Sequence, residues 1–420
     1  MKIRKPRIIC VGHGGIDLEA ILSGILAQNN TIDLTPYLVA EAENGDYYLG
    51  KIYEGVKNGK VKLTLDGNKK NFSFFQSFKS RVELDLYLAN KKIDRQQITE
   101  LKAELSVGQG ALNSAYDMTV FNRSFNKLEI YLATDFDDSR IRKKLPKELR
   151  KRYRGSAEKG KVITNLTISG FNEKLTFRAP SQQYNPYKNN RNKVLEDMAG
   201  NDGVFINGVK NEGYTAMVCR RIRKQKVKHV YISPTDSMVS SLNLGVKNLL
   251  EESEVYVAQI SEMEKLLSLL KGEEVKISRG NSGKLKEAML EVRSMMKNKK
   301  KNARVYVTDN VEGSYVLDEN DRLYYHKVIP AKVENTSGCG DAFASVVVYL
   351  EHLRNLGKRN YLTEDILKYA SVAGQIKAGE KYPYSNKITV NEINKFLNKN
   401  PEADYVKNFT PRYERTRRIC

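Results

Sequence analysis

Residues 335–345 read Asn-Thr-Ser-Gly-Cys-Gly-Asp-Ala-Phe-Ala-Ser and lead into the apolar run 346–350. Gly338 and Gly340 leave backbone N–H groups uncovered where a helix is expected to begin, so these amides and the positive end of the helix dipole could hold a phosphate. Asp341 would lie in the first turn. A carboxylate there repels a phosphate unless it has another task, and taking a proton from an attacking hydroxyl is the task that fits. The stretch therefore indicates phosphoryl transfer.

The same residues also have a purely structural interpretation. A Gly-x-Gly before a helix permits tight packing, and an Asp in the first turn can cap a helix. From this stretch alone the two interpretations have similar weight, so the other parts of the chain must decide between them.

The stretch resembles the signature Asp-Thr-x-Gly-Ala-Gly-Asp of the ribokinase-type (phosphofructokinase-B-type) carbohydrate and nucleoside kinases. The resemblance implies that the amides of Gly338, Cys339 and Gly340 form an anion hole for the transferred phosphoryl group, and that Asp341 is the catalytic base. Cys339 stands where a small Ala is usual, and Asn335 where an Asp is usual. In the family that Asp helps to organise a metal or a monovalent cation, whereas Asn supplies only a neutral oxygen.

A second candidate lies near the N-terminus. Residues 7–11 are apolar and β-branched, which is typical of a buried strand, and the glycine-rich segment 12–15 follows. The glycine spacing does not match the Gly-x-Gly-x-x-Gly of dinucleotide-binding folds. The resemblance instead implies that Asp17 binds substrate hydroxyls, and capping of the following segment is the alternative.

Residues 106–115 are similar to the second motif of the family, Gly-Gly-x-x-x-Asn-x-Ala. Glycine lets the backbone approach a polar ligand, and an Asn can both donate to and accept from hydroxyls. The resemblance implies that Gly108 and Asn113 bind the substrate. Gln109 replaces the second glycine, which narrows the pocket or offers it another amide, so the substrate can differ from ribose or fructose.

Two weaker matches lie further along the chain. Gln259 begins a segment that resembles the Asn-x-x-Glu element of the family, which implies that Glu262 positions magnesium through water; the alternative is a first-turn Glu favoured by the helix dipole. Thr308 and Gly313 match the Thr-x-Gly-x-x-Gly turn that contacts the nucleotide in the family. Asn310 replaces a glycine there, but Asn tolerates a positive φ better than most residues, so we expect the turn to survive.

The elements that must position these residues alternate along the chain. Apolar strands are predicted at 128–133, 204–208, 230–234, 255–258 and 305–308, with helical stretches between several of them. This β-α-β rhythm requires a parallel sheet covered by helices. The predicted fold class is α/β, a ribokinase-like, doubly wound, mostly parallel sheet with a small β lid.

The lid is predicted where the pattern changes to short strands separated by turn pairs, from about residue 35 to 78. Residues 81–105 are then predicted to be helical. The segment is longer than a minimal lid needs, so we expect an enlarged lid, which could also serve a homodimer. The predicted parts are an α/β core over 1–35 and 106–400, the lid over 36–105 with about 160–180, and a basic tail over 401–420.

Composition bounds the partners. The chain of 420 residues has a formal net charge of +21, and residues 135–154, predicted as a helix, are rich in Lys and Arg. Such a charge attracts polyanions, although a solvated Lys-rich surface is the more ordinary explanation. The four cysteines are far apart and predict neither a disulfide framework nor a zinc site. No apolar run approaches the ~20 residues that cross a bilayer, so we expect a soluble, cytoplasmic protein without membrane association.

Together these matches predict an ATP-dependent phosphotransferase that acts on a primary hydroxyl of a sugar, a sugar phosphate or a nucleoside. The implied cofactors are ATP and Mg²⁺, with a monovalent cation left open. The alternative is a non-catalytic, kinase-like scaffold that binds nucleic acid or a transcription complex, which the positive charge, Asn335, Asn310 and Gln109 favour. The presence of Asp341 with both glycines argues against a scaffold, because a scaffold does not need that set.

Overall fold

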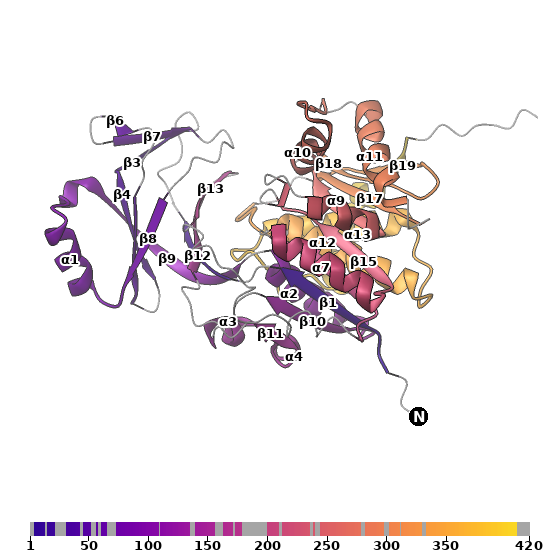
Figure 1. Cartoon of the computed structure of the whole chain (residues 1–420), viewed down its shortest axis with the longest axis horizontal. Helices are drawn as coiled ribbons and strands as arrows, with labels where there is room; N and C mark the ends of the chain where they lie inside the picture. Colours follow the sequence, from indigo (N-terminus) through magenta and orange to yellow (C-terminus); the bar gives the residue numbers. More distant parts are fainter. Residues whose placement is uncertain are drawn as a thin grey trace, which may run out of the picture.

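The computed structural model has two parts, a large sheet covered by helices and a smaller, mainly β part to one side of it (Figure 1). The described residues are 4–12, 15–21, 31–42, 45–51, 56–57, 60–64, 73–108, 110–134, 139–155, 163–170, 173–178, 200–209, 212–235, 238–239, 244–278, 282–297, 302–310, 312–329 and 333–409.

The large part is built on a ten-stranded sheet, which we call the core sheet. Its strands, in spatial order, are β11 (Tyr153–Gly155), β10 (Glu129–Thr134), β1 (Arg7–Gly12), β14 (Gly203–Asn207), β15 (His229–Ser233), β16 (Val255–Gln259), β17 (Arg304–Asp309), β18 (Gly313–Leu317), β19 (Leu323–His326) and β20 (Val406–Asn408). In this spatial order, all the neighbouring pairs from β11 through β10 and β1 to β17 are parallel. Strands β18, β19 and β20 continue the sheet with antiparallel pairs. The predicted α/β class with a mostly parallel sheet is confirmed.

Both faces of the core sheet are buried, as β1 illustrates. Ile8 and Cys10 belong to one apolar cluster, whereas Ile9 and Val11 belong to another. All four side chains are fully buried. Because successive side chains in a strand point to opposite faces, a strand that is apolar at every position needs helices on both sides.

The helices divide between these two clusters. The first cluster includes residues of α2 (Gly110–Asn122), α12 (Cys339–Asn355), α13 (Thr363–Ala378) and α14 (Val390–Lys399). The second includes residues of α7 (Glu212–Gln225), α9 (Leu244–Glu252), α10 (Ile260–Lys271) and α11 (Ser282–Lys297). Where one helix was predicted over 135–154, the structure has the short helices α3 (Ser139–Lys144) and α4 (Lys147–Arg150), and β11 follows them.

The smaller part is a seven-stranded sheet, which we call the lid sheet. Its strands, in spatial order, are β13 (Glu173–Arg178), β12 (Ile163–Gly170), β2 (Gly15–Ile21), β9 (Ile98–Gly108), β4 (Tyr37–Ala42), β5 (Tyr47–Lys51) and β8 (Ser73–Phe78). Helix α1 (Arg81–Asn90) packs on it through the buried Leu84 and Leu88. A separate three-stranded sheet contains β3 (Thr31–Leu34), β7 (Lys60–Thr64) and β6 (Val56–Lys57).

The lid differs from the prediction at two places. Strand β2 pairs with both β9 and β12, so the lid sheet includes residues from 15 onwards, before the predicted boundary at 36. The prediction of a helix over 81–105 was wrong beyond Asn90, because residues 98–108 form β9. The hairpin predicted near 160–180 is present as the antiparallel pair β12 and β13.

The C-terminal part also begins differently from the prediction. The short 3₁₀ helix η2 (Pro401–Asp404) and β20 belong to the large part, and β20 pairs with β19, so the predicted tail from 401 starts within the core sheet. Residues 410–420 lie outside the described residues. In the part of the chain that the structure describes, no helix has the length and apolar character needed to span a membrane.

Candidate active site

Helix α12 begins after Gly338, whose φ of 82° is in the left-handed region that glycine adopts at low cost. A Cβ atom at this position would collide with the carbonyl oxygen of Pro383. The N–H of Cys339 donates to the carbonyl of Thr336 at 3.3 Å, which is a weak bond that a stronger acceptor could replace. An N-terminus that follows a glycine of this kind suits an anion.

Asn335 shapes the loop that leads into α12. Its Oδ1 accepts the N–H of Ser337 at 2.8 Å, and its Nδ2 donates to the carbonyl of Lys381 at 2.7 Å. The side chain is buried. A carboxylate could accept the first bond but could not donate the second, so the Asn in this chain ties two loops together.

The carboxylate of Asp341 is held by two amides. Asn113 Nδ2 donates to its Oδ2 at 3.0 Å, and Asn207 Nδ2 donates to its Oδ1 at 3.0 Å. Since an ionised carboxylate only accepts hydrogen bonds, these two donors orient Asp341 in the form that a general base requires. The first turn of α2, the end of β14 and the first turn of α12 therefore converge on one carboxylate.

Asn207 is a site residue that the sequence prediction missed. It ends β14, is 1% exposed, and donates a second bond to Ser114 Oγ at 2.9 Å. A Cβ atom at Gly12 would collide with its backbone oxygen, and one at Gly110 would collide with its side-chain oxygen. The available signal was a polar residue at the carboxyl end of a parallel strand, where ligands of such sheets bind.

Asn113 keeps one polar atom without a protein partner. The residue is 4% exposed, and its Oδ1 accepts no hydrogen bond from any described residue. A buried acceptor left in this state costs about 1–3 kcal/mol, which a ligand hydroxyl would recover. The role of Asn113 in binding a substrate hydroxyl stays a prediction, and its Oδ1 is the atom that would accept such a bond.

The carboxyl ends of β16 and β17 reach the same region. Gln259 is the register partner of Thr308, and a Cβ atom at Gly340 would lie 3.8 Å from Gln259 Nε2. Glu262 Oε2 accepts the N–H of Gln259 at 2.9 Å, and the Gln259 side chain accepts the N–H of Glu262 in return. Glu262 therefore caps α10, which is the structural alternative that the sequence left open.

A magnesium ion bound with ATP needs few protein ligands. Within the described residues, no group of three or more His, Cys, Asp or Glu side chains could hold a metal. Magnesium usually keeps several waters and is bound by one or two carboxylates and by substrate phosphates. The half-buried Glu262 lies one turn after Gln259, whose side chain is near Gly340, and this position is compatible with such an indirect role.

Asn310 and Gly313 lie at the two sides of the turn between β17 and β18. Asn310 has a φ of 46°, so the expectation that Asn replaces glycine in a turn of positive φ is confirmed. Gly313 has a φ of 141°, and a Cβ atom there would lie 2.5 Å from the carbonyl oxygen of His326. Thr308, which precedes the turn, is half-buried at the carboxyl end of β17.

Asp17 and Gly108 lie on paired strands where the lid sheet joins the core. Gly15 of β2 is the register partner of Gly108, and Asp17 is the register partner of Ser106. Strand β2 closely follows β1, and β9 closely precedes α2, which carries Asn113. The backbone thus connects both residues to the site, while Gln109 and the side chain of Asp17 lie outside what the structure describes.

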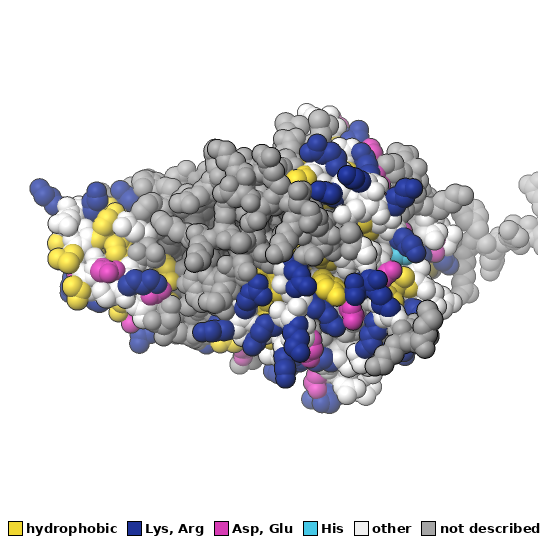
Figure 2. All heavy atoms as spheres, turned by 60° about the horizontal axis from the view of Figure 1, so that its bottom comes forward, with side chains coloured by type: hydrophobic (Ala, Val, Ile, Leu, Met, Phe, Trp, Pro, Cys, Tyr) yellow, Lys and Arg dark blue, Asp and Glu magenta, His cyan; other side chains and the backbone are white. Residues whose placement is uncertain are grey.

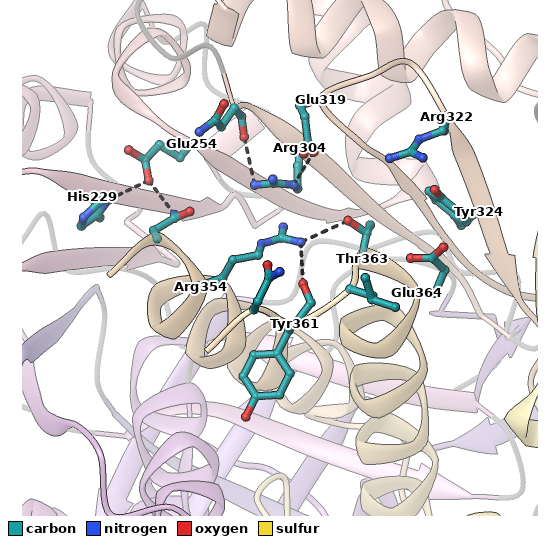
Figure 3. A pocket seen from close by; sticks show the side chains of 14 residues that line it. His229, Glu254, Arg304, Glu319, Arg322, Tyr324, Arg354, Tyr361, Thr363 and Glu364 are labelled. Atoms are coloured by element: carbon teal, nitrogen blue, oxygen red, sulfur yellow. Dashed lines mark hydrogen bonds and ion pairs between the residues drawn. The ribbon is translucent and has the colours of Figure 1, made fainter. Parts of the chain in front are cut away.

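A separate pocket of about 560 Å³ lies at the opposite edge of the core sheet, where β15, β16 and β17 begin. The guanidinium groups of Arg304 and Arg354 face one another in it (Figure 3). Both form ion pairs with the fully buried Glu351, and Arg304 also pairs with Glu319. These charges satisfy one another within the protein, and none of the predicted site residues lines this pocket.

Comparison with solved structures places the whole chain among sugar and nucleoside kinases in fold. Phosphofructokinase-2 from Escherichia coli in complex with fructose 6-phosphate is 13% identical, with a TM-score of 0.57 over 94% of this chain and 99% of that chain. Ribokinase from Arabidopsis thaliana complexed with ribose and ATP is 13% identical, with a TM-score of 0.55 and the same coverage. Adenosine kinase from Anopheles gambiae is 11% identical, with a TM-score of 0.53 over 89% of this chain and 96% of that chain.

Comparison by sequence is more selective. No curated protein sequence matches the chain. The model of one family, described as pfkB family carbohydrate kinase, matches residues 162–389, which is more than half of the chain and includes α12 with Asp341. The chain therefore belongs to the pfkB family of carbohydrate kinases.

Proposed function

We propose that the protein transfers the terminal phosphoryl group of ATP to a primary hydroxyl of a sugar, a sugar phosphate or a nucleoside. The observation that carries this proposal is the carboxylate of Asp341, held by two amides in the first turn of α12. Family membership supports a carbohydrate acceptor. The similar structures named ribokinase, phosphofructokinase-2 and adenosine kinase support the wider range of acceptors.

Asp341 takes the proton of the acceptor hydroxyl in this mechanism. The amides of Asn113 and Asn207 hold both carboxylate oxygens, so the carboxylate has one orientation toward the hydroxyl when it takes the proton. Each oxygen accepts one of these bonds, and a carboxylate oxygen can accept more than one hydrogen bond, so the hydroxyl can approach the same group. The hydroxyl oxygen then attacks the γ-phosphorus atom of ATP as its proton moves to the carboxylate, and the bond from this phosphorus to the bridging oxygen breaks so that ADP leaves.

The backbone from Gly338 to Gly340 stabilises the charge on the transferred phosphoryl group. Its amides and the N-terminus of α12 would donate to the equatorial oxygens, where charge accumulates. Gly338 lies so close to Pro383 that the loop has no room for a Cβ atom there. When bound with ATP, magnesium neutralises the phosphates, and Glu262 would support it through water.

The acceptor and the nucleotide are held from two sides. Asn113 Oδ1 and Asp17 would bind hydroxyls of the acceptor, with Gly108 allowing close approach of the backbone. Thr308 and Gly313, at the carboxyl edge of β17, would contact the nucleotide. The lid sheet would cover the acceptor and exclude water that competes for the phosphoryl group.

The test measures ADP formation from ATP and Mg²⁺ with a panel of pentoses, hexoses, their phosphates and nucleosides. Asp341→Asn keeps the size of the side chain and removes the base, so turnover is expected to fall by about 10²–10⁴-fold or more while both substrates still bind. Asp365→Asn, in the first turn of α13, is the matched control and should keep the wild-type rate. Unchanged turnover in Asp341→Asn would remove the assignment of the base.

A further inference from the structure

The last turn of α13 contains a buried lysine. Lys377 has no exposed side-chain surface, and its Nζ donates to the carbonyl of Asn335 at 2.9 Å. A lysine near a helix C-terminus is stabilised by the helix dipole, but an exposed side chain serves that purpose. Burying an ammonium costs free energy unless polar groups surround it, so this position has a requirement beyond helix stability.

The carbonyl that Lys377 binds belongs to the loop that sets the anion hole. Asn335 lies three residues before Gly338, and its carbonyl is also the acceptor of the Cys339 thiol at 3.9 Å. The N–H groups of Glu334 and Asn335 donate to the carbonyl of Ala378 at 2.7 and 3.1 Å. The end of α13 and the start of the anion-hole loop therefore hold each other from both directions, with the ammonium at their junction.

The charge of Lys377 acts on Asp117, a buried carboxyl of α2. Burial raises the pKa of Asp117 well above its usual range, and the ionised Asp341 raises it further, whereas the charge of Lys377 lowers it. Asp117 lies one turn after Asn113 in α2, and its Oδ1 accepts the N–H of Ser385 at 2.9 Å. The ammonium and the base Asp341 therefore both act on the pKa of the same carboxyl. The ammonium lies beside a loop in which Asn335 carries no charge.

We infer that Lys377 is a positioning residue of the kinase site, a tethered ammonium that holds the anion-hole loop in place of a dissociable monovalent cation. This inference rests on the proposed function. It implies that the wild-type protein needs no added monovalent cation. An ammonium and a potassium ion both bind carbonyl oxygens, so removing the side chain should create a space that a free cation can enter.

Two variants separate charge from volume. Lys377→Ala removes the ammonium and leaves a space, whereas Lys377→Met removes the charge and fills most of the space. Lys368→Ala is the matched control, because Lys368 lies on the same helix and pairs instead with Asp365 and Asp404. Turnover and melting temperature are measured in ammonium, potassium and choline chloride at equal ionic strength.

The wild type and Lys368→Ala should have the same turnover and the same Tm in all three salts. In choline chloride both Lys377 variants should lose about 10–100-fold in kcat. A loss of this size is expected for a residue that contacts the loop of the site and not the substrate. Ammonium or potassium should restore much of the kcat of Lys377→Ala and raise its Tm by about 2 °C or more, and should leave Lys377→Met unchanged.

Activation of the wild type by potassium over choline would overturn the inference, as would a Lys377→Ala variant with wild-type kcat in choline. The Tm arm decides if no acceptor in the panel is phosphorylated. In that case the proposed function fails, while a cation-dependent Tm confined to Lys377→Ala still supports the tethered ammonium. The absence of any cation effect on that Tm would reject it.

Discussion

At the scale of single residues, the site depends on neutral amides. Asn113 and Asn207 each donate to one oxygen of Asp341. An Arg or Lys at either position would orient the carboxylate as well, but its charge would lower the pKa of Asp341 and so weaken it as a base. Amides give direction with a smaller loss of basicity. We therefore expect their removal to affect the chemical step more than substrate binding.

Asn207 allows this argument to be tested. In Asn207→Ala one oxygen of Asp341 loses its donor, and we expect kcat to fall by about 10–100-fold with little change in KM for ATP. Asn207→Asp should be slower still, because two neighbouring carboxylates cannot both ionise easily, and the acidic limb of its pH–rate profile should move to higher pH. Steady-state kinetics across pH measures both effects.

The control for this prediction lies at the other end of α12. Asn355 also donates from its amide to polar side chains, Tyr231 and Glu254, but it lies far along the helix from Asp341. Asn355→Ala should therefore keep the wild-type kcat and pH profile. A kcat in Asn207→Ala equal to that of this control would show that the amide has no part in the chemical step.

At the scale of elements, α12 connects the site to the centre of the core. Its residues from Ala342 to Leu353 are all buried, and it carries Asp341 in its first turn and His352 in its last. A Cβ atom at Gly203 of β14 would lie 2.6 Å from the ring of His352, so this helix end packs tightly on the sheet. The position of the base therefore depends on a helix that cannot shift without disturbing β14.

His352 predicts how the stability of this packing depends on pH. Burial lowers the pKa of His352 to about 3, with the nearby His229 adding to the shift, whereas an unfolded His titrates near 6.5. The folded chain thus keeps the ring neutral. The contribution of this ring to the free energy of unfolding is complete above pH 6.5 and is lost progressively as the pH falls toward 3. Between pH 7 and pH 5 this group should remove about 2 kcal/mol from the free energy of unfolding.

Urea unfolding at pH 7 and pH 5 measures this loss. In His352→Asn the loss should be smaller than in the wild type, because the group that must stay neutral is gone. Part of the loss of unfolding free energy between pH 7 and pH 5 should remain in this variant, since burial also lowers the pKa of His326. Equal losses in the two proteins would contradict the prediction.

The elements that the sequence predicted well were those whose pattern is complete within a few residues. The apolar strands of the core sheet and the signature around Asp341 are of this kind. The helix predicted over 81–105 failed because residues 100, 102 and 104 are polar while 101, 103 and 105 are apolar, which is the period of a strand. Pairing with β2 and β4, distant in sequence, then fixes β9.

Asn207 and Lys377 were missed for a related reason. Asn207 lies 134 residues before the carboxylate that it orients, and Lys377 lies 42 residues after the carbonyl that it binds. Partners so far apart in the sequence form no local motif. Each residue is only a single polar residue in an otherwise apolar or mixed element. Only the fold brings such partners together.

At the scale of the whole molecule, the formal net charge is +21. Figure 2 shows Lys and Arg side chains across one face of the core, with fewer Asp and Glu among them. Some of these cations are paired, since Arg7 and Arg152 both contact Glu129. Both arginines also lie over the ring of Tyr131, where they compete with any base that would stack on it. The described part of this face therefore offers positive charge, but not this ring, to a polyanion.

We therefore expect binding to single-stranded RNA to be weak, independent of sequence and lost as salt rises. Lys143, Lys147 and Lys151 are exposed around α4, and replacing all three with Gln should lower the slope of log K against log salt by about 2–3. Because none of them is a candidate site residue, the same variant should keep wild-type kinase turnover. Fluorescence anisotropy with labelled RNA at several salt concentrations measures the slope. Tight, sequence-dependent binding at physiological salt, together with no turnover on any acceptor, would instead favour the scaffold function, since counterion release alone cannot supply sequence preference.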